Sequence, residues 1–347
     1  MESNNRPYFS ILIPCYNCRN TIERLLNSIF QQVNEDGFTT EIIICDDNST
    51  DNFLELVEPY KNKNEKITIK ICKTDVDFHC PGNTRKRALA EATGVWLTSA
   101  DNDDFFELNA FQTVKKFIEE NNIKYMLSTD FREWSEEKMD FQRYFTGSRC
   151  DTWTHGKWFN LDNLIKKFNI NYKDNMFSHE DVYFNSSTLA HLIGIGEDYI
   201  YIPFYSYRWV ANPNSLSRRY FSKTHVYIEE YLCDYLTATS EPFYAVLNKY
   251  PKQWEFYMNQ ILMGFLHGYF YYESFRYKIG SEALAKNQVY LHDYKNQINE
   301  KLKMNDSDII NYIYSSPQKY NNIKLDCAQG SYPFIETQSF RDFVLNI

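Results

Sequence analysis

The sequence predicts an α/β protein in which a mainly parallel sheet with flanking helices is followed by a helical C-terminal appendage. Two patterns predict this fold class. The first 130 residues alternate short apolar runs with amphipathic segments, as strand–helix–strand units do. From about residue 220 onward, apolar residues recur at helical spacing without strand patterns. We therefore expect a sheet domain over residues 1–220 and a helical region over residues 221–347.

The chain begins with a predicted strand, helix, strand and helix. An apolar run predicts the first strand at residues 9–13, where it ends at Pro14. A second strand is expected at residues 41–45, directly before a polar turn over residues 46–51, and a helix follows at residues 53–60. The helix between the two strands has one apolar stripe that can cover a sheet, made of Ile22, Leu25, Leu26, Ile29, Phe30 and Val33.

Two further strands complete the predicted parallel part. Alternating apolar residues predict a strand at residues 67–72, and a helix is expected at residues 83–93 with Gly94 as its left-handed terminator. A fourth strand, residues 95–100, runs directly into the acidic cluster at 101–104. Ligands of open parallel sheets bind beyond the carboxyl ends of the strands. The polar clusters after the second and fourth strands are therefore expected at one ligand site.

The strand–helix alternation is lost after residue 130. Residues 130–156 form an excursion rich in Phe, Trp, Arg and Glu, and a helix is expected near residues 160–168. Helices without strand signals are expected in the C-terminal region, on the spacing of Tyr231, Leu232, Tyr235, Ile261, Leu262, Phe265, Leu266, Ile298 and Leu302.

Composition describes a globular and acidic protein. Hydrophobic residues make up 43% and charged residues 24% of the 347 residues, which excludes a disordered chain. Lys and Arg total 37 against 46 for Asp and Glu, so the net charge is 37 − 46 = −9. A general basic footprint for nucleic acid or anionic membrane is therefore absent.

The sequence also bears on location and redox state. The longest apolar stretch, residues 261–272, is interrupted by His267 and is shorter than the ~18 residues of a membrane helix, so we expect no membrane span. No basic segment followed by an apolar one begins the chain, so we expect a cytoplasmic protein with reduced cysteines. Cys15 and Cys18 have no second pair at zinc-site spacing, and plain thiols are expected there.

The acidic cluster Asp101-Asn102-Asp103-Asp104 is the most informative feature. Three carboxylates within four residues repel one another unless a cation or solvent compensates their charge. Oxygen ligands of this kind suit Mg²⁺ or Mn²⁺, which bridge carboxylates to substrate phosphates. The alternative is a solvated acidic turn that precedes the next helix.

Taken in order, the motifs resemble those of family-2 glycosyltransferases with the GT-A fold, over roughly residues 8–220. Each motif is short, and the specificity lies in their order and spacing. The matching pieces are Pro14-Cys15-Tyr16-Asn17, residues 46–51, Gly82-Asn83-Thr84-Arg85, Ala92-Thr93-Gly94, residues 101–104, and Glu180-Asp181 with Tyr183 and Phe184.

The resemblance implies a site for the nucleotide of a nucleotide sugar. Tyr16 and Asp47, together with Asp46, correspond to the contacts with the base, and an aspartate that accepts from a ring N–H favours uracil. Arg85 corresponds to the arginine that opens a helix in the family. Its fork of donors suits the base or the phosphates.

The resemblance also assigns the two acidic motifs. Asp101 and Asn102 correspond to contacts with the ribose and the sugar, and Asp103, with Asp101, to ligands of Mn²⁺ or Mg²⁺. Asp181, next to Glu180, corresponds to the general base. Inverting transfer needs a base because an acceptor hydroxyl attacks the anomeric carbon opposite the departing nucleoside diphosphate. A cation would stabilise the charge of that leaving group.

A later segment resembles the loop that closes over the donor diphosphate in some members. Arg208, Ser215 and Arg218 correspond to donor contacts there, although Arg208 could instead be a structural ion-pair partner and Ser215 a turn residue. Next to Arg85 the sequence matches the family less well than elsewhere, because Lys86 and Ala88 stand where the family usually has Asn and Gly.

Several aromatic residues have two interpretations. Lone histidines are more often surface or packed residues than site residues, and three flank the expected site: His79, His155 and His179. Three tryptophans could form an acceptor platform or belong to the core: Trp153, Trp158 and Trp209. An aromatic stripe at helical spacing predicts core or a subunit contact of a homo-oligomer: Tyr257, Ile261, Phe265 and Tyr269.

The resemblance thus implies a metal-dependent inverting transferase that uses a nucleotide sugar, with UDP as the nucleotide that the aspartates favour and a saccharide hydroxyl as the acceptor. A hydroxymethylated pyrimidine in phage DNA stays open as acceptor, although the charge of −9 does not favour it. A binding module without catalysis and a nucleotidyltransferase are further alternatives. The carboxylates at 101, 103 and 181 speak against the first, and the lack of a glycine-rich loop with its lysine speaks against the second.

Overall fold

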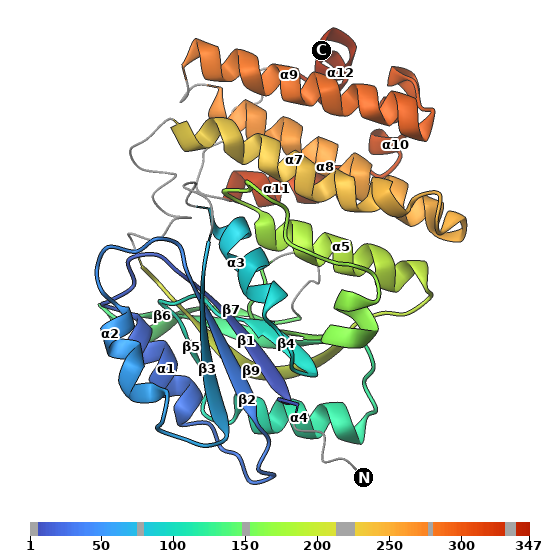
Figure 1. The fold of residues 1–347 in the computed structure, drawn as a ribbon. Coiled ribbons are helices and arrows are strands. Elements are labelled where there is room, and N and C mark those ends of the chain that lie inside the picture. The colour runs from blue at the N-terminus through green and yellow to red at the C-terminus, as the bar shows by residue number, and fades with distance from the viewer. Residues whose placement is uncertain (1–5, 75–79, 148–152, 213–225, 277–279, 330–337) are drawn as a thin grey trace. The chain divides into compact units, whose positions relative to one another are not determined.

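The computed structural model describes residues 6–74, 80–147, 153–212, 226–276, 280–329 and 338–347 (Figure 1). The chain divides into two compact units. The first unit contains the residues up to 212 except 177–179 and 193–195. Those two short segments and the residues from 213 onward make up the second unit.

A nine-stranded mixed sheet forms the centre of the first unit, in the order β3-β2-β1-β4-β8-β6-β9-β5, with β7 paired to β6. Strands β1 to β4 are parallel neighbours, as are β6 and β9, whereas β8, β7 and β5 pair antiparallel. The strands are β1 Phe9–Cys15, β2 Thr40–Asp46, β3 Ile67–Lys73, β4 Trp96–Ser99, β5 Phe105–Phe106, β6 Met126–Ser135, β7 Asp140–Phe145, β8 Lys157–Asn160 and β9 Ile200–Val210. The predicted fold class of a mainly parallel sheet with flanking helices is confirmed.

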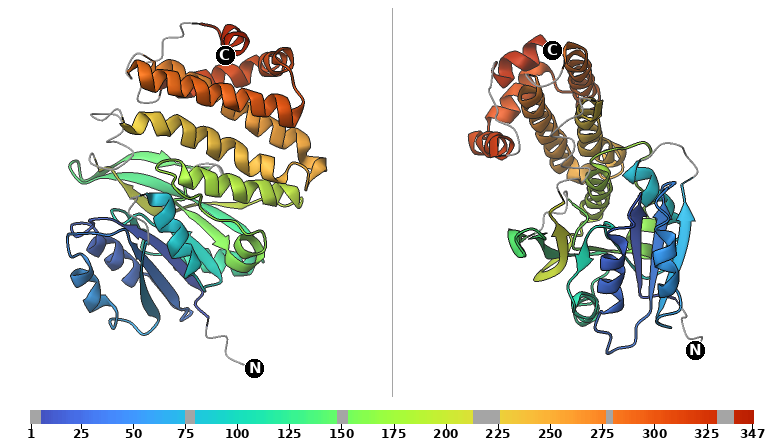
Figure 2. Two further views of the ribbon diagram at one scale, coloured as in Figure 1. Left: turned by 45° about the horizontal axis from the view of Figure 1, so that its top comes forward. Right: turned by 90° about the vertical axis from the view of Figure 1, so that its left-hand side faces the viewer.

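Helices cover both faces of this sheet (Figure 2). In β1, Ile11 and Ile13 join the apolar core together with Leu25 of α1, whereas Leu12 is buried on the opposite face, as the period of two requires. The helical elements are α1 Ile22–Phe30, α2 Leu54–Val57, η1 Glu58–Tyr60, α3 Pro81–Ala90, α4 Ala110–Glu120, η2 Leu161–Lys166 and α5 Glu180–Gly194.

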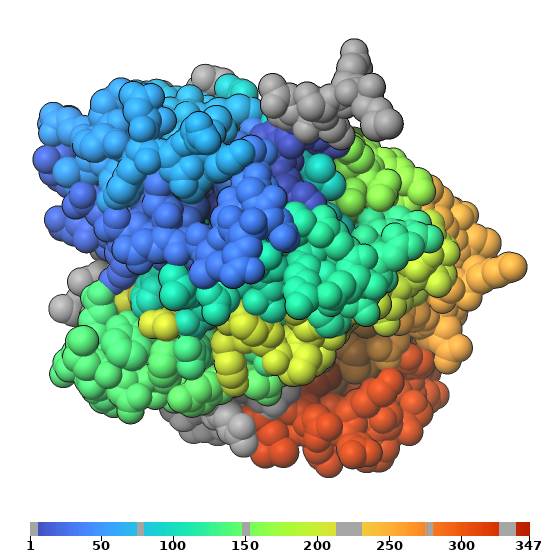
Figure 3. Space-filling model, turned by 90° about the horizontal axis from the view of Figure 1, so that it is seen from below, coloured from blue at the N-terminus to red at the C-terminus, as the bar shows by residue number. Residues whose placement is uncertain are grey.

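Segments far apart in the sequence adjoin one another in this unit. The end of α1 is tied to the start of α4, because Gln32 Nε2 donates to the Glu107 carbonyl at 2.8 Å and Phe111 N donates to Gln32 Oε1 at 3.1 Å. In the space-filling view, the N-terminal segments and the residues around α4 form one surface (Figure 3).

The second unit is helical in the residues that the structure describes. Its elements from residue 226 onward are α7 Val226–Val246, η3 Pro251–Gln253, α8 Trp254–Phe275, α9 Ser281–Gln297, η4 Ile298–Leu302, α10 Asp306–Tyr314, α11 Pro317–Gln329 and α12 Phe340–Asn346. The aromatic stripe of α8 is fully buried in the unit, with no exposed area at Tyr257, Ile261, Phe265 or Tyr269. Core and subunit contact were the two roles predicted for this stripe, and in the structure it is part of the core. Among the described helices, none has the length and apolar character needed to cross a membrane.

The stretch from residue 126 to 145 differs from the expectation of an irregular excursion. It contains β6 and β7, which form an antiparallel pair. Phe131 and Phe145 are cross-strand partners whose rings stack at 4.4 Å, and Arg143 pairs with Glu133 at 2.6 Å. Aromatic and charged residues thus stabilise these strands through cross-strand contacts rather than through a simple apolar alternation.

Gly94 does not end a helix in the left-handed conformation, so that prediction is wrong. α3 ends at Ala90, and Gly94 lies where the backbone passes close to β1. Its N–H donates to Ser10 Oγ at 2.8 Å and to Glu41 Oε1 at 2.9 Å. The position requires glycine because a Cβ would lie 2.5 Å from Ser10 Oγ and 2.9 Å from Ser10 N.

Replacing Gly94 with alanine should therefore destabilise the first unit. The added Cβ cannot be accommodated without moving backbone atoms of β1, and overpacking of this kind costs about 1–3 kcal/mol. We expect Gly94→Ala to lower the midpoint of urea denaturation. Gly280→Ala is the control, because a Cβ at Gly280 would meet no atom within 4 Å. Equal midpoints for the two variants would contradict this explanation.

Candidate active site

The loops after β1 and β2 are bound to each other. Asn17 adopts a left-handed backbone conformation with φ of 50°, and its N–H donates to Ser49 Oγ at 2.9 Å. In return, Thr50 N donates to Asn17 Oδ1 at 2.8 Å. Asparagine tolerates this conformation better than most residues. The structure therefore brings together the two loops that the sequence assigns to the nucleotide base.

The three residues predicted to contact the base differ in their exposure. Tyr16 is 49% exposed, whereas Asp46 and Asp47 are buried. Asp46 Oδ1 accepts from Ser49 N at 2.9 Å, and Asp47 Oδ1 accepts from Thr74 Oγ1 at 2.6 Å. These hydrogen bonds fix both carboxylates at the end of β2, with the tyrosine ring on the outside.

The acidic cluster follows β4 and is held by the neighbouring strand ends. Asn102 Nδ2 donates to the Pro14 carbonyl at 2.9 Å, and its Oδ1 accepts from Thr21 Oγ1 at 3.0 Å. The Asp103 carboxylate accepts from Asn212 Nδ2 at 3.1 Å. Burial raises the pKa of Asp103, and the charge of Asp101 raises it further.

Arg85 lies between the two acidic motifs. It is almost fully buried, and its side chain makes two ion pairs, one with Asp101 at 2.5 Å and one with Glu180. Burial alone would disfavour the charge on Asp101, but the positive charge of Arg85 outweighs it and lowers the pKa of Asp101. Arg85 was predicted to contact the donor. In the structure its two terminal nitrogens pair with protein carboxylates, and its contact with the donor stays a prediction.

Glu180 and Asp181 form the start of α5. Burial raises the pKa of Glu180, and the positive charge of Arg85 opposes this shift. Burial also raises the pKa of Asp181, which the charges of Arg85 and Lys157 lower and that of Asp101 raises. Asp181 therefore lies in the same electrostatic environment as the acidic cluster. The structure brings the predicted base and the predicted cation ligands together.

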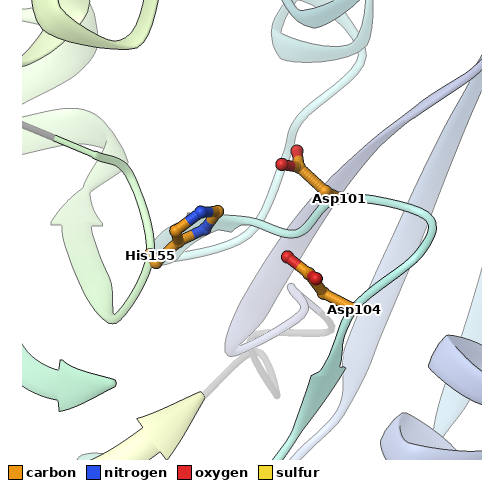
Figure 4. Close-up of side chains that lie close together, drawn as sticks. All are labelled: Asp101, Asp104 and His155. Atoms are coloured by element: carbon orange, nitrogen blue, oxygen red, sulfur yellow. The ribbon is translucent and has the colours of Figure 1, made fainter. Parts of the chain in front are cut away.

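A third group joins the cluster from the segment before β8. Potential ligand atoms of Asp101, Asp104 and His155 all lie within 4.8 Å of one another, and the three side chains face one another in Figure 4. The Nδ1 atom of His155 is buried without a hydrogen-bond partner. Burial lowers the pKa of His155 to about 4, so the ring is neutral at pH 7 and can bind a cation. Sequence reasoning named His155 only as one of three lone histidines, because chain order does not reveal its position beside Asp101.

Asp104 is fully buried, unlike its neighbours in the cluster. One carboxylate oxygen accepts from the Tyr207 hydroxyl at 2.8 Å and the other from Val210 N at 2.7 Å. The Asp101 N–H in turn donates to the Tyr207 oxygen at 3.0 Å, and the His155 ring stacks on Tyr207 at 4.9 Å. Tyr207 of β9 thus organises the acidic turn, a role that its place in an aromatic segment did not indicate.

Arg208, a further predicted donor contact, pairs with another side chain of the protein. Arg208 makes a two-point ion pair with Glu107, at 2.7 Å through Nε and 2.5 Å through an amino group. This is the structural alternative named for Arg208, and its guanidinium does not join the carboxylates of the site. Ser215, Arg218 and His79 lie outside the described residues.

The other candidates divide between core and site. Trp158 is fully buried against Phe9 and Phe111, which makes it a core residue. Trp209 lies beside His155, with ring centroids 6.0 Å apart, and Trp153 is 39% exposed. Cys15 and Cys18 are buried in the apolar core, where a role as metal ligands is not supported.

Known proteins share the sequence features of the first unit. The family model for glycosyl transferase family 2 matches residues 10–192. The poly(ribitol-phosphate) β-N-acetylglucosaminyltransferase TarS of Staphylococcus aureus is 32% identical over 119 residues, which are 34% of this chain and 20% of TarS. Hyaluronan synthase of Pasteurella multocida is 31% identical over 128 residues, which are 37% of this chain and 12% of the synthase. The aligned region of this chain therefore corresponds to at most a fifth of the length of either relative.

Solved structures share the fold. S. aureus TarS 1–349 in complex with UDP-GlcNAc matches with a TM-score of 0.68 at 18% identity, over 95% of this chain and 98% of that one. The mannosyltransferase PcManGT from Pyrobaculum calidifontis, in complex with GDP-Man and Mn²⁺, matches with a TM-score of 0.51 at 13% identity, over 94% and 85% of the two chains. The fold is the expected GT-A type. Because the family model covers more than half of the 347 residues, the chain belongs to glycosyl transferase family 2.

Proposed function

We propose that this protein is a metal-dependent inverting glycosyltransferase that moves a sugar from a UDP-linked donor to a hydroxyl of a saccharide acceptor. The juxtaposition of the acidic cluster with Glu180-Asp181, joined by Arg85, carries this proposal. Transfer of a sugar requires a base for the acceptor and compensation of charge on the leaving diphosphate, and the two acidic motifs supply candidates for both.

The donor side of the proposal rests on the loops after β1 and β2. Tyr16, Asp46 and Asp47 are the proposed contacts with the nucleotide base, and Asp101 and Asn102 those with the ribose and sugar. The bonds between the two loops support this because they hold the contacts in place before the ligand arrives. The solved TarS structure contains UDP-GlcNAc, which favours UDP as the nucleotide here.

The acidic cluster fits a divalent cation. Asp101 and Asp103 are the proposed ligands, and the orphaned Nδ1 of buried His155 offers a further one beside Asp101. Carboxylate oxygens are ligands that suit Mn²⁺ and Mg²⁺. When bound, the cation would act as a Lewis acid toward the departing diphosphate.

Asp181 is the proposed general base. As the acceptor oxygen attacks the anomeric carbon, its proton passes to the Asp181 carboxylate, and the bond between the sugar and the diphosphate breaks on the opposite face. Inversion follows from this single displacement. Arg85, which pairs with Glu180 and Asp101, is proposed to fix the base relative to the cation ligands rather than to bind the donor.

The acceptor is proposed from chemistry and from relatives. By their names, TarS and a poly(ribitol-phosphate) β-glucosyltransferase of Bacillus spizizenii act on poly(ribitol-phosphate). Two further relatives, both from Pasteurella multocida, are named hyaluronan synthase and chondroitin synthase. The net charge of −9 favours a saccharide over DNA. The role that we propose for the helical region from residue 221 is in acceptor binding or in assembly.

The donor and metal dependence can be tested with a panel of nucleotide sugars. Release of UDP from a UDP-sugar with Mn²⁺, and its loss with EDTA, are the expected results. Asp103→Ala should weaken Mn²⁺-dependent binding of UDP, measured by calorimetry, because a proposed cation ligand is removed. Asp140→Ala is the control, since Asp140 lies on the exposed strand β7. Release of pyrophosphate instead of UDP would contradict the proposal and indicate nucleotidyl transfer.

The base can be tested by its pH dependence. Asp181 acts only when deprotonated, and its pKa lies above the ordinary value of about 3.9. The acid limb of kcat/KM should therefore fall at a pH above that value, as Asp181 becomes protonated. Asp181→Asn should keep UDP binding and lower transfer by about 10²- to 10⁴-fold. Asp174→Asn, at an exposed aspartate that pairs with Lys86, should change little. Near-normal turnover of Asp181→Asn would show that another group is the base.

Arg85 can be tested by stability. Arg85→Met leaves the Glu180 and Asp101 carboxylates without their cation, and breaking a buried ion pair costs about 3–5 kcal/mol. Arg87 lies on the same helix and pairs with Glu91 at the surface, so Arg87→Met should cost less than about 1 kcal/mol. Urea denaturation measures both. Equal costs would mean that the Arg85 pairs are no stronger than a surface pair.

A further inference from the structure

The three residues before the proposed base are held by a carboxylate from another part of the chain. Phe177, Ser178 and His179 belong by their contacts to the second unit, and Glu180 follows them directly. Asp234 Oδ2, from α7, accepts from Phe177 N at 3.0 Å and from Ser178 N at 2.9 Å. The Ser178 hydroxyl lies 3.3 Å from the same oxygen. One charged oxygen therefore binds two successive peptide N–H groups and a hydroxyl.

His179 is fixed in an uncommon conformation. Its φ of 57° is left-handed, which costs free energy for a residue with a Cβ. The imidazole is held from three sides: its Nδ1 lies 3.0 Å from Ser178 Oγ, and its ring packs edge-on against Tyr231 at 4.4 Å and Tyr235 at 5.2 Å. Burial lowers the pKa of His179 to about 3, so the ring is neutral and packed rather than a charged contact. These contacts retain the left-handed turn.

The turn determines how the chain enters α5. Asp181 is two residues beyond His179, and consecutive Cα atoms are only about 3.8 Å apart. A change in the backbone at Ser178 or His179 therefore moves or rotates the first turn of α5, which carries Asp181. Capping the helix would not require this arrangement, because caps are usually local side chains. Asp234 is 56 residues away from Ser178 in the sequence.

We propose that Asp234 is a positioning residue for the general base: by binding the Phe177 and Ser178 peptide groups, it sets the turn from which Asp181 projects. The inference rests on the proposed function, in which Asp181 takes the acceptor proton. Asp234 does not touch the reacting atoms in this account. Its effect is on the rate of transfer rather than on the affinity for the donor.

Three variants test the inference in the full chain. Asp234→Ala removes the acceptor oxygen, and a small displacement of a catalytic group lowers rates by about 10²-fold, so we expect kcat to fall about 10- to 100-fold. The KM for the UDP-sugar and the affinity for UDP should stay within about twofold. Asp234→Asn keeps a carbonyl oxygen that can accept from both N–H groups, and it should restore most of the rate. Asp293→Ala is the control, because the Asp293 side chain on α9 is 62% exposed, and it should keep the wild-type rate.

The probe is the UDP-sugar that the wild-type protein turns over with Mn²⁺, with rates taken per UDP-binding molecule and thermal unfolding measured in parallel. A role in stability alone would lower Tm and leave kcat per UDP-binding molecule unchanged. An active wild type with an equally active Asp234→Ala would overturn this inference and leave the proposed function standing. If kcat falls in Asp234→Ala and Asp234→Asn does not restore it, the inference is likewise overturned. A wild type that turns over no UDP-sugar would overturn the proposed function and this inference together.

Discussion

The buried guanidinium of Arg85 is the interaction on which the site depends. It joins Asp101, 16 residues further along the chain, to Glu180, which is 95 residues away. Carboxylates gathered at one place repel one another, and burial increases that repulsion because water no longer screens it. An always-charged side chain with two donor nitrogens offsets the repulsion and fixes the geometry at the same time. The acidic turn after β4 and the start of α5 can therefore lie close together before any ligand is present.

The sheet topology explains why these motifs meet. β1, β2 and β4 are parallel neighbours, so the loops that follow them emerge at one edge. Side chains then bind the loops to one another: Asn17 joins the first two, and Asn102 joins the turn after β4 to Pro14 at the end of β1. Each loop is short and polar and would have little structure alone. Together they are ordered, because side chains of one loop form hydrogen bonds with backbone groups of the next.

The parallel strands could be predicted from the sequence, and the motifs of the candidate site could be recognised in it, because both are local patterns. Apolar runs of β1 and β2 and the stripe of α1 depend on near neighbours in the chain. What it did not reveal depends on contacts across long separations. Gly94 is required by the approach of Ser10, and Arg85 is occupied by carboxylates that no spacing rule connects to it. Strands β6 and β7 were missed because their stability comes from cross-strand aromatic and charged pairs.

The three aspartates after β4 are chemically distinct, although the sequence presents them as one cluster. Asp101 is compensated by the Arg85 cation, and Asp104 is buried with a hydroxyl and a peptide N–H on its two oxygens. The carboxylate of Asp103 accepts from the neutral amide of Asn212. The proposed cation would therefore offset the charge of Asp103 more than that of its neighbours, since Asp101 and Asp104 already have strong partners. The same reasoning explains the tyrosine at 207: by binding Asp104 it keeps one carboxylate of the cluster as part of the framework, while the other two remain near the position where a ligand would bind.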